Sequence, residues 1–86
     1  MENLDEECVC RICGFVDGPF REDGCALNSI CGCCGSESGI EDNLLEGVRS
    51  VRGYWVCRSS EWFRPSDKPE GWDLLTQLEN IPPEWR

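Results

Sequence analysis

The sequence predicts a small domain of the α+β class, in which a cysteine-bearing β-hairpin comes first and two helices follow. Three observations lead to this prediction. Two Cys-x-x-Cys-Gly units occur, at 10–14 and 31–35, with 17 residues between Cys13 and Cys31. After the second unit, the spacing of apolar residues changes to that of a helix. The chain has 86 residues and eight cysteines, and a domain of this size needs a staple in addition to its apolar core.

The two Cys-x-x-Cys-Gly units predict a four-cysteine metal site. Two cysteines three positions apart on a tight turn can point both sulfur atoms at one ion. The glycines that follow, Gly14 and Gly35, accept the positive φ that such a turn requires. Two turns that face each other form a zinc ribbon, whose four thiolates enclose one structural Zn²⁺ per chain. Iron in the same site, a pair of disulfide bonds and four buried thiols without a metal are the alternatives. The predicted ligands are Cys10, Cys13, Cys31 and Cys34.

The other four cysteines are not assigned as ligands. Cys33 lies between two predicted ligands, and its side chain should point away from theirs, so we expect a packing residue; a spare ligand in a site shifted by one residue is the alternative. Cys8 precedes Cys10 by two positions in a predicted strand, points the same way, and is therefore the alternative ligand. Cys25 and Cys57 are expected to be free thiols. In an oxidising compartment, these four cysteines could instead form two disulfide bonds around the metal site.

Short strands and turns are expected around the metal site. One strand is predicted at 8–10 and a second at 25–30, and the two are expected to pair with each other. The segments 17–20 and 21–24 contain glycine, proline and aspartate and predict two turns. Residues 35–39 are expected to form a flexible link without an apolar anchor.

The second half of the chain predicts two helices. Apolar residues at helical spacing from Leu44 to Trp55 predict a helix at 42–57, with Asp42 or Asn43 as its N-cap. A second helix is predicted at 73–80, with Asp73 as its N-cap and Pro82-Pro83 after its end. The first three of the four tryptophans, Trp55, Trp62 and Trp72, are expected to pack the helices onto the ribbon, and Trp85 is expected to be exposed.

The predicted organisation is one domain with a short tail at each end. Residues 1–7 are expected to be a disordered acidic tail, residues 8–81 the zinc-ribbon domain with its helices, and residues 82–86 a loose tail. The acidic, polar start has no secretory signal pattern, and no segment is long and apolar enough to span a bilayer. We therefore expect a cytoplasmic location without membrane contact, where thiols stay reduced and bind metal.

A set of short motifs extends along the chain: Cys10-x-x-Cys13-Gly14-Phe15, Gly18-Pro19-Phe20, Glu22-Asp23-Gly24, Ile30-Cys31-x-Cys33-Cys34-Gly35, Glu41-Asp42, Trp55, Trp62-Phe63-x-Pro65 and Pro69-x-Gly71-Trp72. Together these motifs resemble the bacterial cysteine-rich CPCC family over about residues 10–81. The resemblance implies a small bacterial protein with a zinc site at the four predicted ligands and largely without an assigned function. One departure is Gly32, which replaces the family's proline and makes the second turn less pre-organised.

Charge and composition narrow the range of functions. The net charge is −9, and residues 1–46 contain eleven acidic and two basic side chains. Such a surface repels phosphate, so nucleic-acid binding is disfavoured, although Arg49, Arg52 and Arg58 lie on one predicted helical stretch. The chain has no histidine for a catalytic pair, and zinc held by four cysteines has no open position for water, so an enzyme is not expected.

The expected function is that of a non-catalytic, zinc-stabilised protein-interaction module. Its partner is an unknown protein, and a basic one suits the acidic surface. An antitoxin or immunity protein that neutralises a basic toxin is the specific version of this hypothesis. The alternative is a rubredoxin-like electron carrier with iron in the four thiolates, because rubredoxins share the paired Cys-x-x-Cys-Gly turns and a small acidic chain.

Overall fold

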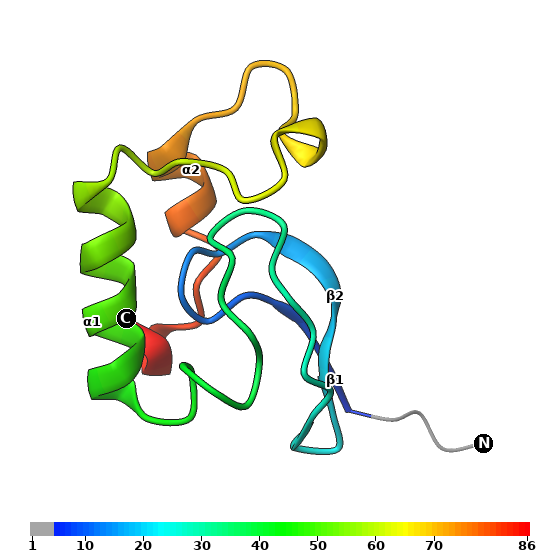
Figure 1. Ribbon diagram of the computed structural model, residues 1–86. Helices are drawn as coiled ribbons and strands as arrows, with labels where there is room; N and C mark the ends of the chain where they lie inside the picture. Colours follow the sequence, from blue (N-terminus) through cyan, green and yellow to red (C-terminus); the bar gives the residue numbers. More distant parts are fainter. Residues whose placement is uncertain (1–4) are drawn as a thin grey trace.

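The computed structural model describes residues 5–86 and shows an α+β domain with a three-stranded antiparallel sheet and two α-helices (Figure 1). Within this range, no helix combines the length and the apolar character that a bilayer-spanning helix requires. Residues 1–4 of the predicted tail lie outside the described residues. The elements in chain order are β1 (Glu6–Val9), β2 (Val16–Glu22), β3 (Cys25–Ala26), α1 (Leu45–Cys57), the 3₁₀ turn η1 (Pro65–Asp67), α2 (Leu74–Leu78) and the 3₁₀ turn η2 (Pro83–Trp85).

The central strand of the sheet is β2, where the sequence predicted two turns. The strand order is β1-β2-β3, and the predicted turns at 17–20 and 21–24 are therefore wrong for most of their residues. Val9 pairs with Val16 and Glu7 with Arg21, so four residues of β2 lie opposite a single residue of β1. Pro19, which has no N–H to donate, falls in this irregular stretch and therefore interrupts no regular ladder.

The hairpin of the sheet joins β2 to β3 instead of joining the two predicted strands. Asp23 and Gly24 form its two-residue turn, with φ of 51° and 78°. Positive φ at both positions is the geometry for which an Asp-Gly pair is favoured. The predicted strand at 25–30 contains only the two residues of β3, and it pairs with β2 and not with β1. Because β1 begins at Glu6, the sheet also includes two residues that were predicted to belong to the tail.

Both predicted helices are present, with shorter bounds. In α1, Val48 and Trp55 are buried, which confirms this part of the predicted apolar stripe. Leu44, with which the predicted stripe begins, lies before the helix and is 71% exposed, so the stripe is wrong at that position. The residue at the N-cap position is Leu44 and it makes no side-chain cap, so the predicted capping by Asp42 or Asn43 is wrong. In α2, the predicted N-cap is correct: the carboxylate of Asp73 accepts hydrogen bonds from the hydroxyl of Thr76 at 2.7 Å and from its N–H at 2.9 Å, and these bonds lower the pKa of Asp73.

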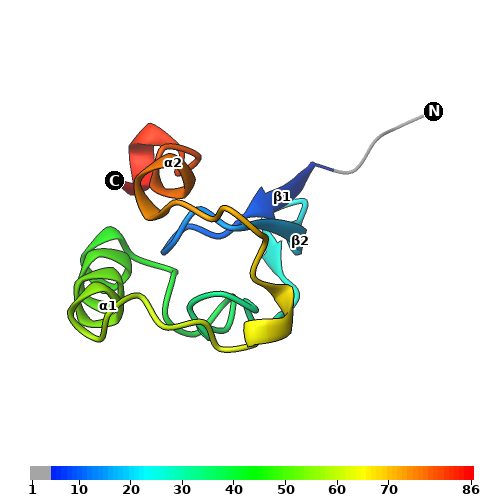
Figure 2. The ribbon, with the colours of Figure 1, turned by 90° about the horizontal axis from the view of Figure 1, so that it is seen from above.

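The two cysteine-bearing turns lie between α1 and the sheet, so the core of the domain surrounds them (Figures 1 and 2). Trp62 is buried and meets the rings of Phe15 and Trp72 edge-on, with centroid distances of 5.1 and 5.5 Å. The prediction that the first three tryptophans pack in the core is confirmed. The buried core residues are Cys10, Ile12, Cys13, Phe20, Cys31, Cys33, Val48, Trp55 and Trp62.

The C-terminal residues pack against the domain, so the predicted loose tail at 82–86 is wrong. The prediction that Trp85 is exposed is also wrong: its half-buried ring lies under the guanidinium of Arg11, whose Cζ atom is 3.9 Å from the ring centroid. Arg52 of α1 donates to the carbonyl oxygens of Arg11, Ile12 and Trp85 at 2.6 to 2.8 Å, and burial lowers its pKa. One guanidinium therefore ties the first cysteine turn, α1 and η2 together.

Candidate metal centre

The two Cys-x-x-Cys-Gly turns have the same backbone geometry. In each turn, the N–H of the glycine donates to the carbonyl of the first cysteine at 2.9 Å. The N–H of that cysteine donates in turn to the carbonyl of the residue after the glycine, at 2.9 Å in the first turn and 2.8 Å in the second. Gly14 and Gly35 have φ of 83° and 80°, which confirms the predicted need for glycine.

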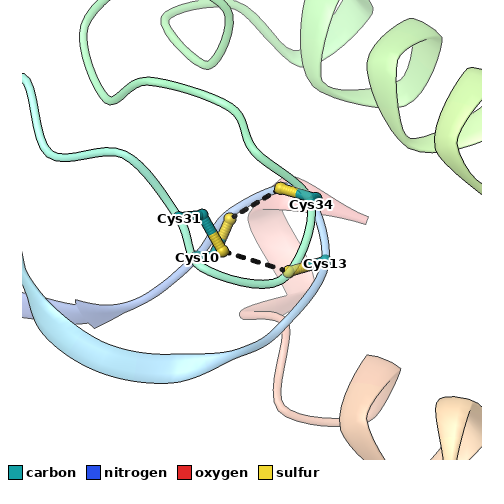
Figure 3. Close-up of side chains that lie close together, drawn as sticks. All are labelled: Cys10, Cys13, Cys31 and Cys34. Atoms are coloured by element: carbon teal, nitrogen blue, oxygen red, sulfur yellow. Dashed lines mark hydrogen bonds between the residues drawn. The ribbon is translucent and has the colours of Figure 1, made fainter. Parts of the chain in front are cut away.

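The turns bring four sulfur atoms together (Figure 3). The Sγ atoms of Cys10 and Cys34 are 3.7 Å apart and those of Cys13 and Cys31 are 3.6 Å apart. All four lie within 4.8 Å of one another. A zinc–sulfur bond of about 2.3 Å gives a tetrahedron with sulfur atoms about 3.8 Å apart. The four cysteines are thus positioned to bind a metal ion, and their identity as ligands and that of the metal remain predictions.

Hydrogen bonds within the cluster shift the pKa values of three of its cysteines, and not all in the same direction. Hydrogen bonds from Cys13, Cys31 and Cys34 lower the pKa of Cys10, because they stabilise its thiolate. The hydrogen bond to Cys10 raises the pKa of both Cys13 and Cys31, since it favours their protonated form. A metal ion requires all four thiolates, so its binding must displace protons from the cluster.

Two polar side chains that the sequence analysis missed surround the cluster. The buried Ser36 places its Oγ atom 3.1 Å from Sγ of Cys34 and 3.9 Å from Sγ of Cys10. Gln77 of α2 donates from Nε2 to the carbonyl of Cys13 at 3.1 Å and to Sγ of Cys33 at 3.3 Å. Ser36 can donate to a sulfur of the cluster, whereas Gln77 holds the backbone of Cys13, and outer contacts of this kind orient the ligands. The position of Ser36, directly after a turn glycine, is the signal that could have found it.

The remaining cysteines lie outside the cluster. Cys33 is fully buried in the core, which confirms its prediction as a packing residue. Cys8, the alternative ligand, is half-buried and does not join the four. Cys25 and Cys57 are exposed. All eight cysteines are free thiols, so neither disulfide alternative is present in this structure.

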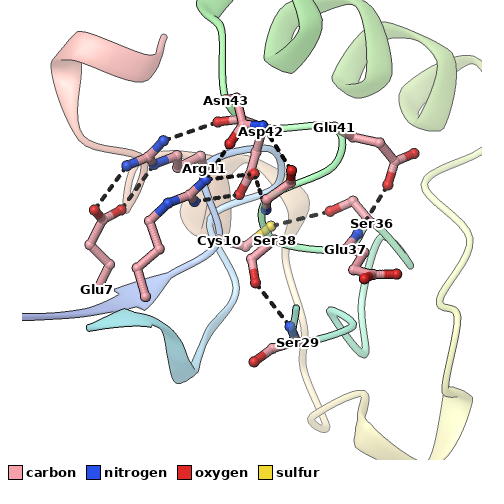
Figure 4. A network of polar contacts seen from close by, with 12 residues as sticks. Glu7, Cys10, Arg11, Ser29, Ser36, Glu37, Ser38, Glu41, Asp42 and Asn43 are labelled. Carbon is pink, nitrogen blue, oxygen red and sulfur yellow. Dashed lines mark hydrogen bonds and ion pairs between the residues drawn. The ribbon is translucent and has the colours of Figure 1, made fainter. Parts of the chain in front are cut away.

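A polar network holds the second turn against the sheet (Figure 4). Arg21 of β2 donates to both carboxylate oxygens of Asp42, at 2.8 and 3.0 Å, and this raises the pKa of Arg21. Asp42 also accepts from the N–H of Gly39 at 2.8 Å. The buried Ser38 accepts from the N–H of Ser29 at 2.9 Å. The segment 35–39, predicted to be a flexible link, is therefore anchored by polar contacts in place of apolar ones.

Comparisons with models of protein families, with curated proteins and with solved structures find no match for this chain. The resemblance to the CPCC family therefore stays a prediction. What the site does has to be inferred from its own geometry and charge.

Replacing Gly14 with alanine is expected to destabilise the domain and weaken its metal binding. A Cβ atom at this position would overlap the backbone carbonyl oxygen of Gln77, in addition to the strain of φ = 83°. Gly24 is the matched control, because it has φ = 78° but no atom within 4 Å of the added Cβ. We expect a loss of about 1 kcal/mol for Gly24→Ala and about 2–4 kcal/mol for Gly14→Ala in urea unfolding. Equal losses would contradict the contact between this turn and α2.

Proposed function

We propose that the chain is a non-catalytic zinc ribbon that acts as a protein-interaction module. The observation that carries this proposal is the cluster of four thiols at the spacing of a zinc tetrahedron, with three of the four cysteines buried. Four cysteine ligands leave no coordination position for water or substrate, which is the arrangement of structural zinc. The absence of histidine from the sequence also removes the commonest general base.

The role of the metal would be to hold the domain together. In the part of the chain that the structure describes, the sheet has only thirteen residues in three strands, and the buried core consists largely of the cysteines themselves and a few apolar side chains. A domain that folds around a metal obtains much of its folding free energy from metal binding. This supports a structural role for the ion: it would stabilise the domain, and the domain would present a binding surface.

The partner of this surface is proposed to be a basic protein. The net charge of −9 is concentrated in residues 1–46, and four zinc-bound thiolates would add a charge of about −2 to that region. Charge of one sign speeds association with a partner of the opposite sign. An antitoxin or immunity protein directed at a basic toxin is one form of this proposal, and it fits the size and charge of the chain.

The metal content of the untagged protein, measured by elemental mass spectrometry beside its visible spectrum, tests the proposal. One zinc per chain and no colour is the expected result. Iron with a thiolate charge-transfer band would replace the proposal with the rubredoxin-like electron carrier. A folded protein without any metal would contradict both functions, because each depends on the four thiolates.

A further inference from the structure

A groove lies between the C-terminal half of α1 and the second cysteine turn. Residues 61–63, which follow α1 in the chain, also line it. Its volume is about 260 Å³. Cofactor and drug-sized ligands occupy sites of about 300–1,000 Å³, so this groove is smaller than such a site and suits one large side chain. We call it the anchor groove. It is lined by Cys34–Ser36, Glu41, Val51, Tyr54, Trp55, Arg58 and Glu61–Phe63.

The walls of the anchor groove combine exposed aromatic surface with carboxylates. Tyr54 and Phe63 are 65% and 59% exposed although they are large apolar residues, so both rings are open to a partner. Glu41 and Glu61 also line the groove, and no ion pair within residues 5–86 neutralises either one. The guanidinium of Arg58 already lies over the Tyr54 ring, 5.4 Å from its centroid. Aromatic residues that are exposed around a small pocket are typical of binding hot spots.

The anchor groove is built on the second turn, so the metal site and the groove share a wall. The N–H of Phe63 donates to the carbonyl of Cys33 at 2.8 Å, and the Phe63 ring lies against Gly35. The N–H of Arg64 donates to the carbonyl of Gly32 at 2.8 Å. These contacts fix the exposed Phe63 ring beside the groove without burying it.

We propose that the anchor groove is the docking site for a basic peptide segment of the partner protein. The segment seats one aromatic or large aliphatic side chain between Tyr54 and Phe63, and its flanking Lys or Arg side chains lie beside Glu41 and Glu61. The two carboxylates of the groove outweigh the one guanidinium of Arg58, and this negative charge and the net charge of −9 both favour a cationic occupant. This inference rests on the proposed function, because it names the surface and the partner class of that module.

NMR titration of the full-length, zinc-loaded chain tests the docking site. The probe is a blocked peptide of sequence Gly-Lys-Lys-Phe-Lys-Lys-Gly, and two matched peptides replace its Phe by Ala or its four Lys by Glu. We expect the amide signals of Gly35, Tyr54 and Phe63 to shift with the first peptide. The Ala and the Glu peptides should bind at least about 10-fold more weakly, as expected when an anchor or the complementary charge is lost.

Variants of the chain identify the contacts. Tyr54→Ala should weaken binding of the Lys/Phe peptide about 10-fold, as expected for a hot-spot aromatic. The double variant Glu41→Gln/Glu61→Gln should weaken it about 3- to 10-fold, as expected for two exposed ion pairs. Leu75 of α2 is 70% exposed and does not line the groove, so Leu75→Ala is the matched control and should change the affinity less than twofold.

Three results would overturn the docking site. They are the absence of shifts at millimolar Lys/Phe peptide, equal binding of the Ala peptide, and groove signals that move on dilution without any peptide, which would show that a second copy of the chain covers the groove. If the zinc-loaded chain does not bind the peptide, the proposed interaction module is retained, but its binding surface lies elsewhere. A metal-free chain that folds and binds the peptide would instead refute the zinc ribbon and retain the groove.

Discussion

Replacing Cys13 with serine is expected to abolish metal binding and to unfold the domain. Cys13 is fully buried and its sulfur lies 3.6 Å from that of Cys31. A serine hydroxyl does not provide the thiolate that the metal requires, so the tetrahedral shell would lose one of its four ligands. Loss of an outer-shell partner alone lowers metal affinity about 10–100-fold, so loss of a ligand should lower it by more than about 100-fold. Cys34→Ser is expected to have the same effect.

Circular dichroism and competition with a chelator measure these losses. Excess EDTA should unfold the unmodified chain to the same state, because metal binding and folding are one equilibrium in such domains. Cys33→Ser is the closest control: Cys33 lies in the same turn but outside the sulfur cluster, and the amide of Gln77 can donate to a serine oxygen there. Cys25→Ser controls for the loss of an exposed thiol. Unfolding by Cys33→Ser to the same extent would show that the assigned ligands are wrong.

The parts of the structure that the sequence predicted are those that depend on neighbouring residues. Each cysteine turn is closed by hydrogen bonds between residues four or five positions apart, and its glycine marks it in the sequence. The stripe of α1 and the Asp73 cap of α2 are equally local. The prediction that the two turns lie together rested on one further assumption, namely that four cysteines in two such turns share one ion.

The parts that the sequence did not predict depend on contacts between distant residues. By its local sequence, Pro19 predicts a turn. It can lie in a central strand because the pairing of β2 with β1 is irregular at this position. Trp85 lies after two prolines and is held by Arg11, while Gln77 reaches the first turn from 64 residues away. The position of Asp42 in the sequence is suitable for an N-cap. Its carboxylate is instead paired with Arg21 of β2, and α1 begins three residues later.

Replacing Asp42 with alanine is expected to destabilise the domain by about 3–5 kcal/mol, as does the loss of one partner from other buried ion pairs. The side chains of Arg21 and Asp42 are only 4% and 7% exposed, and they form two hydrogen bonds. Without Asp42, the buried guanidinium would keep Asn43 as its one side-chain partner among residues 5–86, and the N–H of Gly39 would lose its acceptor. Urea unfolding of the metal-loaded chain measures the loss.

The exposed pair of Arg64 and Asp67 provides the control for this prediction. The side chains of Arg64 and Asp67 are 49% and 35% exposed, and Nη1 of Arg64 lies 3.4 Å from Oδ2 of Asp67. Asp67→Ala should therefore lower the free energy of unfolding by at most about 1 kcal/mol. Because the buried pair connects β2 to the segment between the second turn and α1, Asp42→Ala should also weaken zinc binding, whereas Asp67→Ala should not. The double variant Arg21→Met/Asp42→Leu should recover much of the stability, since it removes both charges together. If it is as unstable as the sum of its single variants, the pair does not act as a unit and the second turn is held by its backbone contacts alone.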